Sequence, residues 1–232
     1  MIREIGRIEA DLPEDLWHLA QQILGEIGLD AADLPDHSTL VKAFDRPRMA
    51  IWQVLLRLSA QLHEPSGHAA IDSTFFDREN ASRHHYRRTN YRVQTLKATA
   101  LVDTASQAVL DVHCTTRKRH DTRIGAQVAR VPQGDLRSLA ADKGYDWRRL
   151  RERLRDEGVR PLIKHRLFRT VDHAHNARID STRYGQRSMC ETVFSTIKRT
   201  LGDAVRARTW YGEFRELVLM CVVYNIKETL NP

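Results

Sequence analysis

Three acidic residues, far apart in the sequence, occupy positions from which they can share a metal ion. Asp72 ends the apolar run 69–71, which is typical of a buried strand, and Asp142 follows a second apolar run at residues 136–141. Glu191 lies within an amphipathic helical pattern. Carboxylate oxygens are the ligands that magnesium prefers, and two divalent cations can activate a water and stabilise a leaving oxygen. These residues therefore predict metal-dependent chemistry on a phosphodiester.

The helix expected around Glu191 has one polar and one apolar side. At about 100° per residue, four polar side chains fall within an arc of about 60° and three apolar ones lie opposite. The polar set is Tyr184, Arg187, Glu191 and Lys198, and the apolar set is Met189, Val193 and Ile197. We expect a single helix that displays a carboxylate between cations, which suits a metal ion beside phosphate oxygens. Ion pairing on a solvated helix face is the plainer alternative.

The charge of the chain is unevenly distributed. Residues 1–66 contain six basic and eleven acidic side chains, a balance of −5, whereas residues 67–232 contain 31 basic and 19 acidic ones, a balance of +12. A strongly basic region indicates a polyanionic partner such as nucleic acid. Charge alone does not identify a reaction.

A basic and aromatic cluster occupies residues 83–92, between the first two expected strands. Its predicted DNA contacts are Arg83, Arg87, Arg88, Tyr91 and Arg92. Arginine neutralises phosphates and tyrosine can stack on an exposed base, so binding through this cluster would depend strongly on salt. A solvated loop is the alternative.

Other candidate residues have simpler interpretations. The histidine pairs at 84–85 and 173/175 lack a cysteine or carboxylate partner at familiar ligand spacing, so they are not predicted to bind a transition metal. Asp103 and Asp111 are expected to be structural, and Asp146 to support the site without binding the metal. The three cysteines are expected to be reduced and buried.

The predicted elements form a mixed α/β order after a helical N-terminal region. Strands are expected at 69–74, 95–102, 108–115, 136–141 and 159–163, and helices at 38–44, 49–62, 121–131, 147–157 and 211–228. The turn at 65–67 separates a helical region, 1–64, from a catalytic domain, 67–232. Region 1–64 is either a helix-turn-helix reader or a packing and dimerisation module, and its acidity favours the second.

Nothing in the sequence predicts a membrane span. The longest uninterrupted apolar run, residues 217–224, is far shorter than the roughly 20 residues that a bilayer requires. A cytoplasmic, nucleoid-associated protein is expected.

The spacing Tyr-x2-Arg-x3-Glu-x6-Lys, at Tyr184, Arg187, Glu191 and Lys198, resembles the signature of DDE transposases from prokaryotic insertion sequences. The resemblance is greatest to the group named after insertion sequence number five, particularly its archaeal members. It extends over residues 36–228 and includes the strings Ala-Ile-Asp-Ser-Thr-Phe-Phe and Ala-Ala-Asp-Lys-Gly-Tyr-Asp.

This resemblance implies an RNase H-like core, a mixed five-stranded sheet flanked by helices. It implies that Asp72, Asp142 and Glu191 bind two Mg²⁺ ions, for which Mn²⁺ can substitute. It further implies nicking at the ends of the element, followed by attack of the freed 3′-hydroxyl on target DNA. The expected partners are double-stranded DNA, both terminal inverted repeats and target, and a second copy of the chain on that DNA. Tyr184 and Arg187 would contact DNA near the cut, and Lys198 a backbone phosphate.

Two alternatives stay open at this stage. One is an RNase H-like nuclease that cuts without joining. The other is a truncated, non-catalytic DNA-binding relic, because the first residues of the chain differ from the family pattern. The presence of all three carboxylates argues against the relic.

Overall fold

The computed structural model describes residues 37–78, 95–116, 136–207 and 209–230. The chain forms two compact units, Met1–Arg48 and Met49–Pro232. In the first unit, helix α3 spans His37–Asp45, close to the short helix predicted there. The helix predicted at 121–131 and the cluster at 83–92 lie outside the described residues.

The second unit begins earlier than the turn at 65–67. Helix α4, Met49–Ala60, belongs to it, because Trp52 and Leu56 are buried and the helix contacts strand β3 and helix α11. Gln53 also donates a hydrogen bond from Nε2 to the carbonyl of Val112 in that strand, at 3.4 Å. Helix α4 is therefore part of the same compact unit as the sheet.

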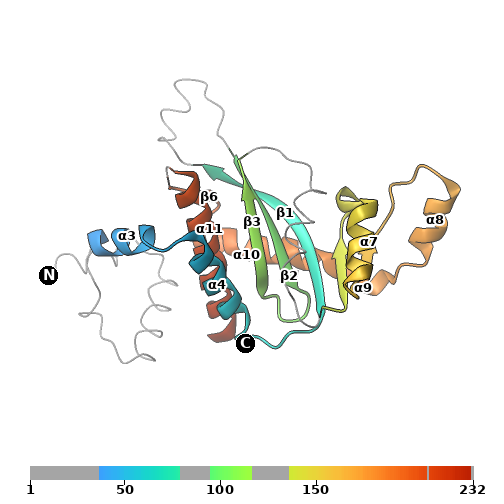
Figure 1. Cartoon of the computed structure of the whole chain (residues 1–232), viewed down its shortest axis with the longest axis horizontal. Coiled ribbons are helices and arrows are strands. Elements are labelled where there is room, and N and C mark those ends of the chain that lie inside the picture. The colour runs from blue at the N-terminus through green and yellow to red at the C-terminus, as the bar shows by residue number, and fades with distance from the viewer. Residues whose placement is uncertain (1–36, 79–94, 117–135, 208, 231–232) are drawn as a thin grey trace, which may run out of the picture. The chain divides into compact units, whose positions relative to one another are not determined.

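One mixed sheet organises the described part of the second unit (Figure 1). Its strands are β1 His68–Arg78, β2 Thr95–Asp103, β3 Val109–Thr115, β4 Ser138–Ala141, β5 Arg160–Ile163 and β6 Ala204–Val205. The order is β3-β2-β1-β4-β5, with β6 beside β1. Pairing is antiparallel between β1, β2 and β3, and parallel between β1, β4 and β5. This confirms the predicted RNase H-like α/β fold, with β6 as an additional strand.

Helices cover both faces of the sheet. They are α7 Arg148–Asp156, α8 Thr170–Ala177, α9 Ser181–Gly185, α10 Met189–Leu201 and α11 Trp210–Leu230, with 3₁₀ turns η2 Lys143–Tyr145 and η3 Gln186–Ser188. Ile71 belongs to a buried cluster with Leu150 and Leu154 of α7. Phe76 meets Phe194 of α10, with ring centroids 6.4 Å apart. Because alternate strand residues point to opposite faces, α7 and α10 lie on opposite sides of the sheet.

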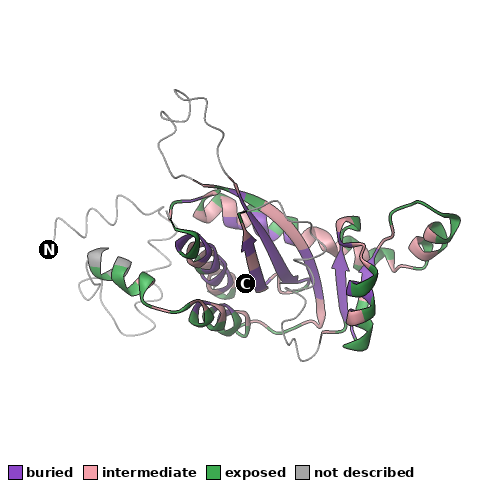
Figure 2. Ribbon diagram, turned by 45° about the horizontal axis from the view of Figure 1, so that its top comes forward, coloured by how far each residue is buried: buried purple, intermediate pink, exposed green. Residues whose placement is uncertain are grey.

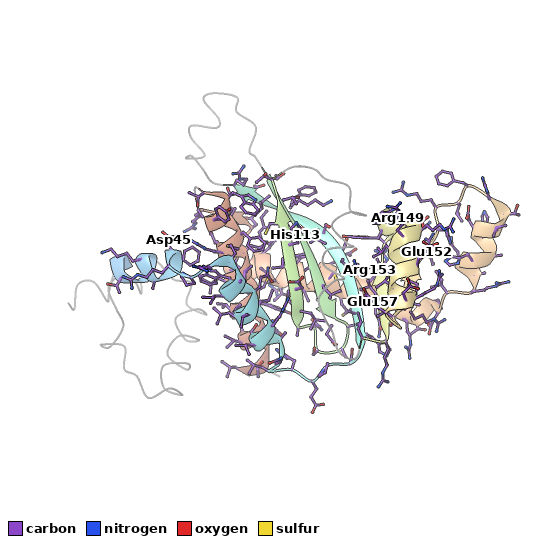
Figure 3. All side chains as sticks on the ribbon, viewed as in Figure 1. Asp45, His113, Arg149, Glu152, Arg153 and Glu157 are labelled. Atoms are coloured by element: carbon purple, nitrogen blue, oxygen red, sulfur yellow. The ribbon has the colours of Figure 1, made fainter. Side chains whose placement is uncertain are left out.

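Burial follows this layered arrangement. Figure 2 shows the strands in the centre as buried, with the outer sides of the helices exposed. The outer side of α7, for example, carries the exposed residues Arg149 and Glu152, and the exposed Glu157 directly follows the helix (Figure 3). No helix in the described ranges has the length and apolar character needed to cross a membrane.

Asp111 is a carboxyl group buried in β3, only 8 % exposed. Burial raises its pKa to about 6, although the Val112 N–H and the charge of Arg57 act in the opposite direction. The folded protein therefore gives up this proton at a higher pH than the unfolded chain, so the free energy of unfolding falls as pH rises from about 4 to about 6.

We expect Asp111→Asn to remove this pH dependence and to raise the free energy of unfolding at pH 7 by up to about 3 kcal/mol. Urea unfolding of both proteins between pH 4 and pH 7 measures the difference. If the two stability curves run parallel over this range, the ionisation of Asp111 does not destabilise the fold.

Candidate active site

Asp72 and Asp142 come side by side because of the strand register. Strands β1 and β4 are parallel neighbours in which Ile71 pairs with Ala141, so each aspartate follows its strand partner at the same level. Neighbouring strands lie about 4.8 Å apart. Asp72 is partly buried within β1, whereas Asp142 is exposed at the end of β4, where its carbonyl accepts the Tyr145 N–H at 2.9 Å. The two predicted carboxylates thus share one edge of the site.

Helix α10 brings Glu191 to the same place. Cys190 is fully buried, and the pKa of its thiol is raised by burial and by the charges of Asp72 and Glu191, against an opposing backbone hydrogen bond from Asp72. The first turn of α10 therefore lies against β1 near Asp72. Glu191 is the next residue, and its side chain is 63 % exposed.

The three carboxylates are close enough to influence one another. The pKa of Asp72 is raised first by burial and further by the negative charges of Glu191 and Asp142, against the opposing Ser73 N–H and Arg187 charge. Among the described residues, however, no group of three His, Cys, Asp or Glu side chains is arranged so that it could hold a metal ion. The charges of the three carboxylates therefore interact, but their oxygens are not arranged around a shared metal position.

Arg187 and Tyr184 lie beside the carboxylates, but not on one continuous helix with Glu191. Arg187 Nη1 is 3.7 Å from Glu191 Oε1, and its guanidinium carbon is 5.7 Å from the Tyr184 ring centroid. Burial raises the pKa of Tyr184, and the charge of Asp142 raises it further, although Arg187 opposes this shift. Lys164 Nζ is 4.4 Å from the centroid of the same ring. The cations and the ring therefore border the carboxylates.

The single helix predicted through residues 184–198 is wrong, because η3 separates α9 from α10. A 3₁₀ turn has 3.0 residues per turn, so the rotation between Tyr184 and Glu191 differs from that of an α-helix. Gly185 favours the helix poorly, and Ser188 Oγ bonds the Gly185 carbonyl at 3.1 Å. The predicted burial of Val193 and Ile197 is confirmed.

Lys198 is bound to the strand that carries Asp72. Its Nζ donates to Thr74 Oγ1 and to the Phe75 carbonyl, both at 2.8 Å, and lies 5.0 Å from the Phe76 ring centroid. Burial lowers the pKa of Lys198. Since an ammonium group has three N–H donors, two bonds to β1 leave one for a phosphate oxygen.

A hydroxyl bridge beside Asp72 was not anticipated from the sequence. Ser73 Oγ is 2.8 Å from Tyr145 Oη and 2.7 Å from Thr99 Oγ1. Tyr145 is 2 % exposed and belongs to η2, the turn that follows Asp142. The bridge therefore ties the strand at Asp72 to the turn after Asp142. No residue spacing signals a contact between positions so far apart in sequence.

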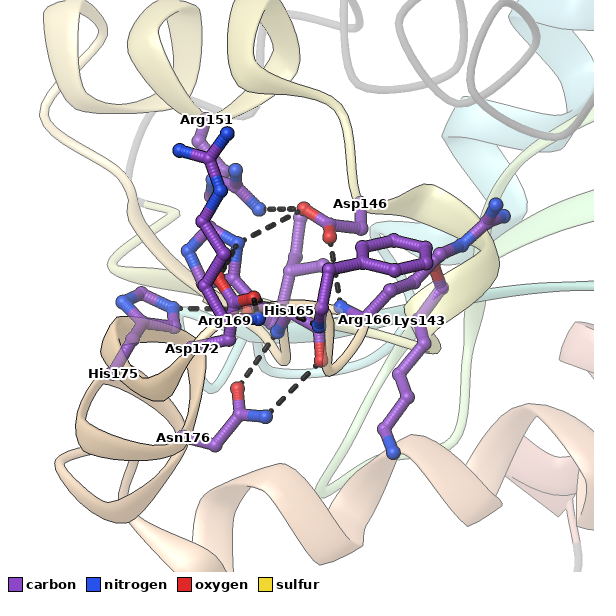
Figure 4. A network of polar contacts seen from close by, with 11 residues as sticks. Lys143, Asp146, Arg151, His165, Arg166, Arg169, Asp172, His175 and Asn176 are labelled. Atoms are coloured by element: carbon purple, nitrogen blue, oxygen red, sulfur yellow. Dashed lines mark hydrogen bonds and ion pairs between the residues drawn. The ribbon is translucent and has the colours of Figure 1, made fainter.

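Asp146 anchors the segment that follows β5 (Figure 4). Its carboxylate is paired with Arg151, accepts the Arg166 N–H at 2.9 Å and lies 3.5 Å from His165 Nδ1. These contacts hold the pKa of Asp146 below its usual value in spite of burial. His175 packs edge-on against His165, with ring centroids 3.9 Å apart, and its Nε2 lies 3.3 Å from the Ile163 carbonyl. The contacts of His165 and His175 thus hold the segment after β5 in place.

Fold and site together define a class of protein. A family model described as "Transposase DDE domain" matches residues 63–226, so the chain belongs to the DDE transposase domain family.

Among similar solved structures is one titled "Cryo-EM structure of piggyBac transposase synaptic complex with hairpin DNA (SNHP)". The TM-score is 0.50 at 12% sequence identity, and the match covers 83% of this chain and 52% of that one. This chain thus corresponds to about half of that transposase, and the likeness concerns the fold. A search of curated proteins found no significant match.

Proposed function

We propose that this chain is a transposase of the insertion-sequence-five group, with the Tyr-Arg-Glu-Lys signature at Tyr184, Arg187, Glu191 and Lys198. It nicks DNA at the ends of its element and joins the freed 3′-end to target DNA. The observation that carries the proposal is the convergence on Asp72. Asp142 follows it in register on the neighbouring strand, and Glu191, in the first turn of α10, is near enough for its charge to raise the pKa of Asp72.

The donor set suits two Mg²⁺ ions, with Mn²⁺ as a substitute. All three side chains provide hard carboxylate oxygens, which Mg²⁺ prefers. The raised pKa of Asp72 reflects, beyond burial, the negative charges of Glu191 and Asp142, which Arg187 offsets in part and a divalent cation would offset further. Glu191 is exposed enough to approach Asp72 by a change of rotamer. Bound ions would supply an activated water or 3′-hydroxyl and relieve charge on the leaving oxygen.

The surrounding residues would position the DNA. Arg187, already 3.7 Å from Glu191, can transfer its guanidinium to a phosphate oxygen once the carboxylate holds metal. Lys198 would place its remaining N–H on a neighbouring phosphate. Tyr184, between Lys164 and Arg187, would contact DNA near the cut. Arg83, Arg87, Arg88, Tyr91 and Arg92 would extend this contact.

The proposed partners are duplex DNA, as terminal repeats and as target, and a second copy of the chain on that DNA. The balance of +12 in residues 67–232 supports a polyanionic partner. The similar piggyBac structure is of a synaptic complex with hairpin DNA. Concerted processing of two element ends requires two active sites, which is the reason for proposing a dimer.

The test is a cleavage and joining assay on DNA that carries the inverted repeats flanking the gene. We expect nicking in Mg²⁺ but not in EDTA, and loss of nicking in Glu191→Gln with DNA binding kept. Glu152→Gln is the matched control, because Glu152 is a carboxylate on the outside of α7, bonded to Arg148 at 2.6 Å.

The outcomes separate the alternatives. If wild type and Glu191→Gln nick equally, the assignment of Glu191 is wrong. Binding without nicking by either protein would identify a non-catalytic relic. Nicking without transfer of a 3′-end to target DNA would identify a nuclease.

A further inference from the structure

The segment between β5 and α9 exposes three apolar side chains within five consecutive residues, 167–171. In this segment, residues 164–177, which we call the finger, Leu167 is 49 % exposed, Phe168 83 % and Val171 74 %. Figure 1 shows α8, which belongs to the finger, standing away from the sheet beyond α7. Grouped apolar side chains left in solvent indicate a surface that binds a partner.

The backbone that carries these side chains is fixed by hydrogen bonds. The N–H groups of Phe168 and Arg169 both donate to Asp172 Oδ2, at 3.0 and 2.7 Å. The Phe168 N–H also lies 3.1 Å from the Arg166 carbonyl. The phenyl ring is thus presented to solvent from an ordered turn.

The base of the finger is connected to the candidate active site. Arg166 Nε donates to the Lys143 carbonyl at 3.3 Å, one residue after Asp142, and the Arg166 N–H donates to Asp146 (Figure 4). Asn176 closes the base by accepting the His165 N–H at 2.7 Å and donating to the His165 carbonyl at 3.1 Å. A ligand held by the finger is therefore positioned relative to Asp142.

The charge around the apolar tip favours a polyanion. Arg166 and Arg169 flank Leu167 and Phe168 in the sequence. Asp172 is the one acidic residue of the finger, and the two backbone N–H groups that it accepts lower its pKa and keep it ionised, so its single negative charge stands against the three positive charges of Lys164, Arg166 and Arg169. Proteins that bend DNA insert apolar side chains such as Phe or Leu between base steps, with basic groups on the phosphates. The finger combines both features.

We propose that the finger is a DNA wedge. Phe168 enters between base pairs beside the bond that is cut and unstacks them, while Arg166 and Arg169 hold the adjoining phosphates. The position beside the cut bond rests on the proposed function; insertion into duplex DNA does not.

The test uses short duplex oligonucleotides with 2-aminopurine at the centre, in EDTA so that cleavage plays no part. Wild type raises the 2-aminopurine fluorescence and binds a centrally mismatched duplex more tightly than the matched one, because the mismatch lowers the cost of unstacking. Phe168→Ala loses the fluorescence rise and roughly tenfold of the affinity for the mismatched duplex. Its salt dependence is unchanged, since no phosphate contact is removed.

Two further variants distinguish stacking from charge. Arg169→Gln weakens binding to both duplexes alike and lowers the salt slope by about 0.9. Leu58→Ala removes an apolar side chain, 54 % exposed, from α4 and leaves the binding and the fluorescence as in wild type.

Three results would overturn the wedge. One is a wild type with neither a fluorescence rise nor a mismatch preference, and another is a Phe168→Ala variant that behaves as wild type. The third is a DNA-free dimer in sedimentation that Phe168→Ala converts to a monomer, which would make the tip a protein interface. The binding assay contains no metal, so it is independent of the cleavage assay. A protein that does not cleave DNA in Mg²⁺ would refute the proposed catalysis, but it would leave the test of the wedge unchanged.

Discussion

Replacing Asp72 by asparagine is expected to reduce metal-dependent DNA cleavage by about 1000-fold or more, a loss of several kcal/mol of transition-state stabilisation. The same change should raise the free energy of unfolding at neutral pH without metal. Asp72 is held partly buried near the charges of Glu191 and Asp142, and both effects raise its pKa. Asparagine removes the negative charge of this side chain. That charge destabilises the folded protein without metal, but it is needed for metal binding.

The pH dependence follows from the direction of the shift. Since the folded state holds this proton to a higher pH than the unfolded chain, the wild-type free energy of unfolding falls as pH rises from 3.8 through the raised pKa. The affinity for metal rises with pH over the same interval, because the ionised carboxylate is the form that binds metal.

Urea unfolding in EDTA and nicking rates in Mg²⁺ measure the two quantities. Asp156→Asn is the matched control, because it alters an exposed carboxylate at the end of α7. A variant that is as active as wild type would contradict the role of Asp72. A variant that is less stable at neutral pH would show that Asp72 serves the fold rather than the reaction.

Asn225→Ala is expected to lower the free energy of unfolding by about 2–5 kcal/mol. Asn225 is fully buried in α11 and bonds both backbone groups of Val109, accepting the N–H at 2.8 Å and donating to the carbonyl at 3.0 Å. Strand β3 is at the end of the sheet order, so its outer backbone groups need partners from elsewhere. Alanine would leave these buried groups without hydrogen bonds.

A graded series tests this explanation. Asn225 Nδ2 also donates to Ser59 Oγ of α4 at 3.0 Å, so Ser59→Ala removes one contact of the same cluster and should cost about 1 kcal/mol. Both variants are compared with wild type by urea unfolding at neutral pH. If Asn225→Ala lowers the free energy of unfolding by less than Ser59→Ala does, Asn225 does not hold β3 to α11.

The sequence predicts most strands because each contains a short apolar run or an alternating apolar pattern. Strands β1, β4 and β5 begin or end within a few residues of the predicted limits, since their buried residues alternate or run together between turn residues. Strand β6 has only two residues, Ala204 and Val205, and no periodicity can appear over that length. Its pairing with the end of β1 depends on tertiary structure.

The candidate site likewise has features that the sequence predicts and features that depend on tertiary structure. The positions of Asp72, Asp142 and Glu191 on their elements could be predicted, because a carboxylate after an apolar strand or on a helix is visible in sequence. The bridge from Ser73 to Tyr145 could not, because it depends on two elements meeting in space. The 3₁₀ turn at Gln186–Ser188 is a local event, yet the amphipathic pattern continues across it and conceals it.

The most direct test of the account is diffraction from crystals soaked in MnCl₂, with data collected at the manganese absorption edge. We predict two manganese peaks beside Asp72, Asp142 and Glu191, the three residues that would hold the ions. Crystals with no manganese beside Asp72, or with the three carboxylates more than about 10 Å apart in the presence of metal, would contradict a shared two-metal site.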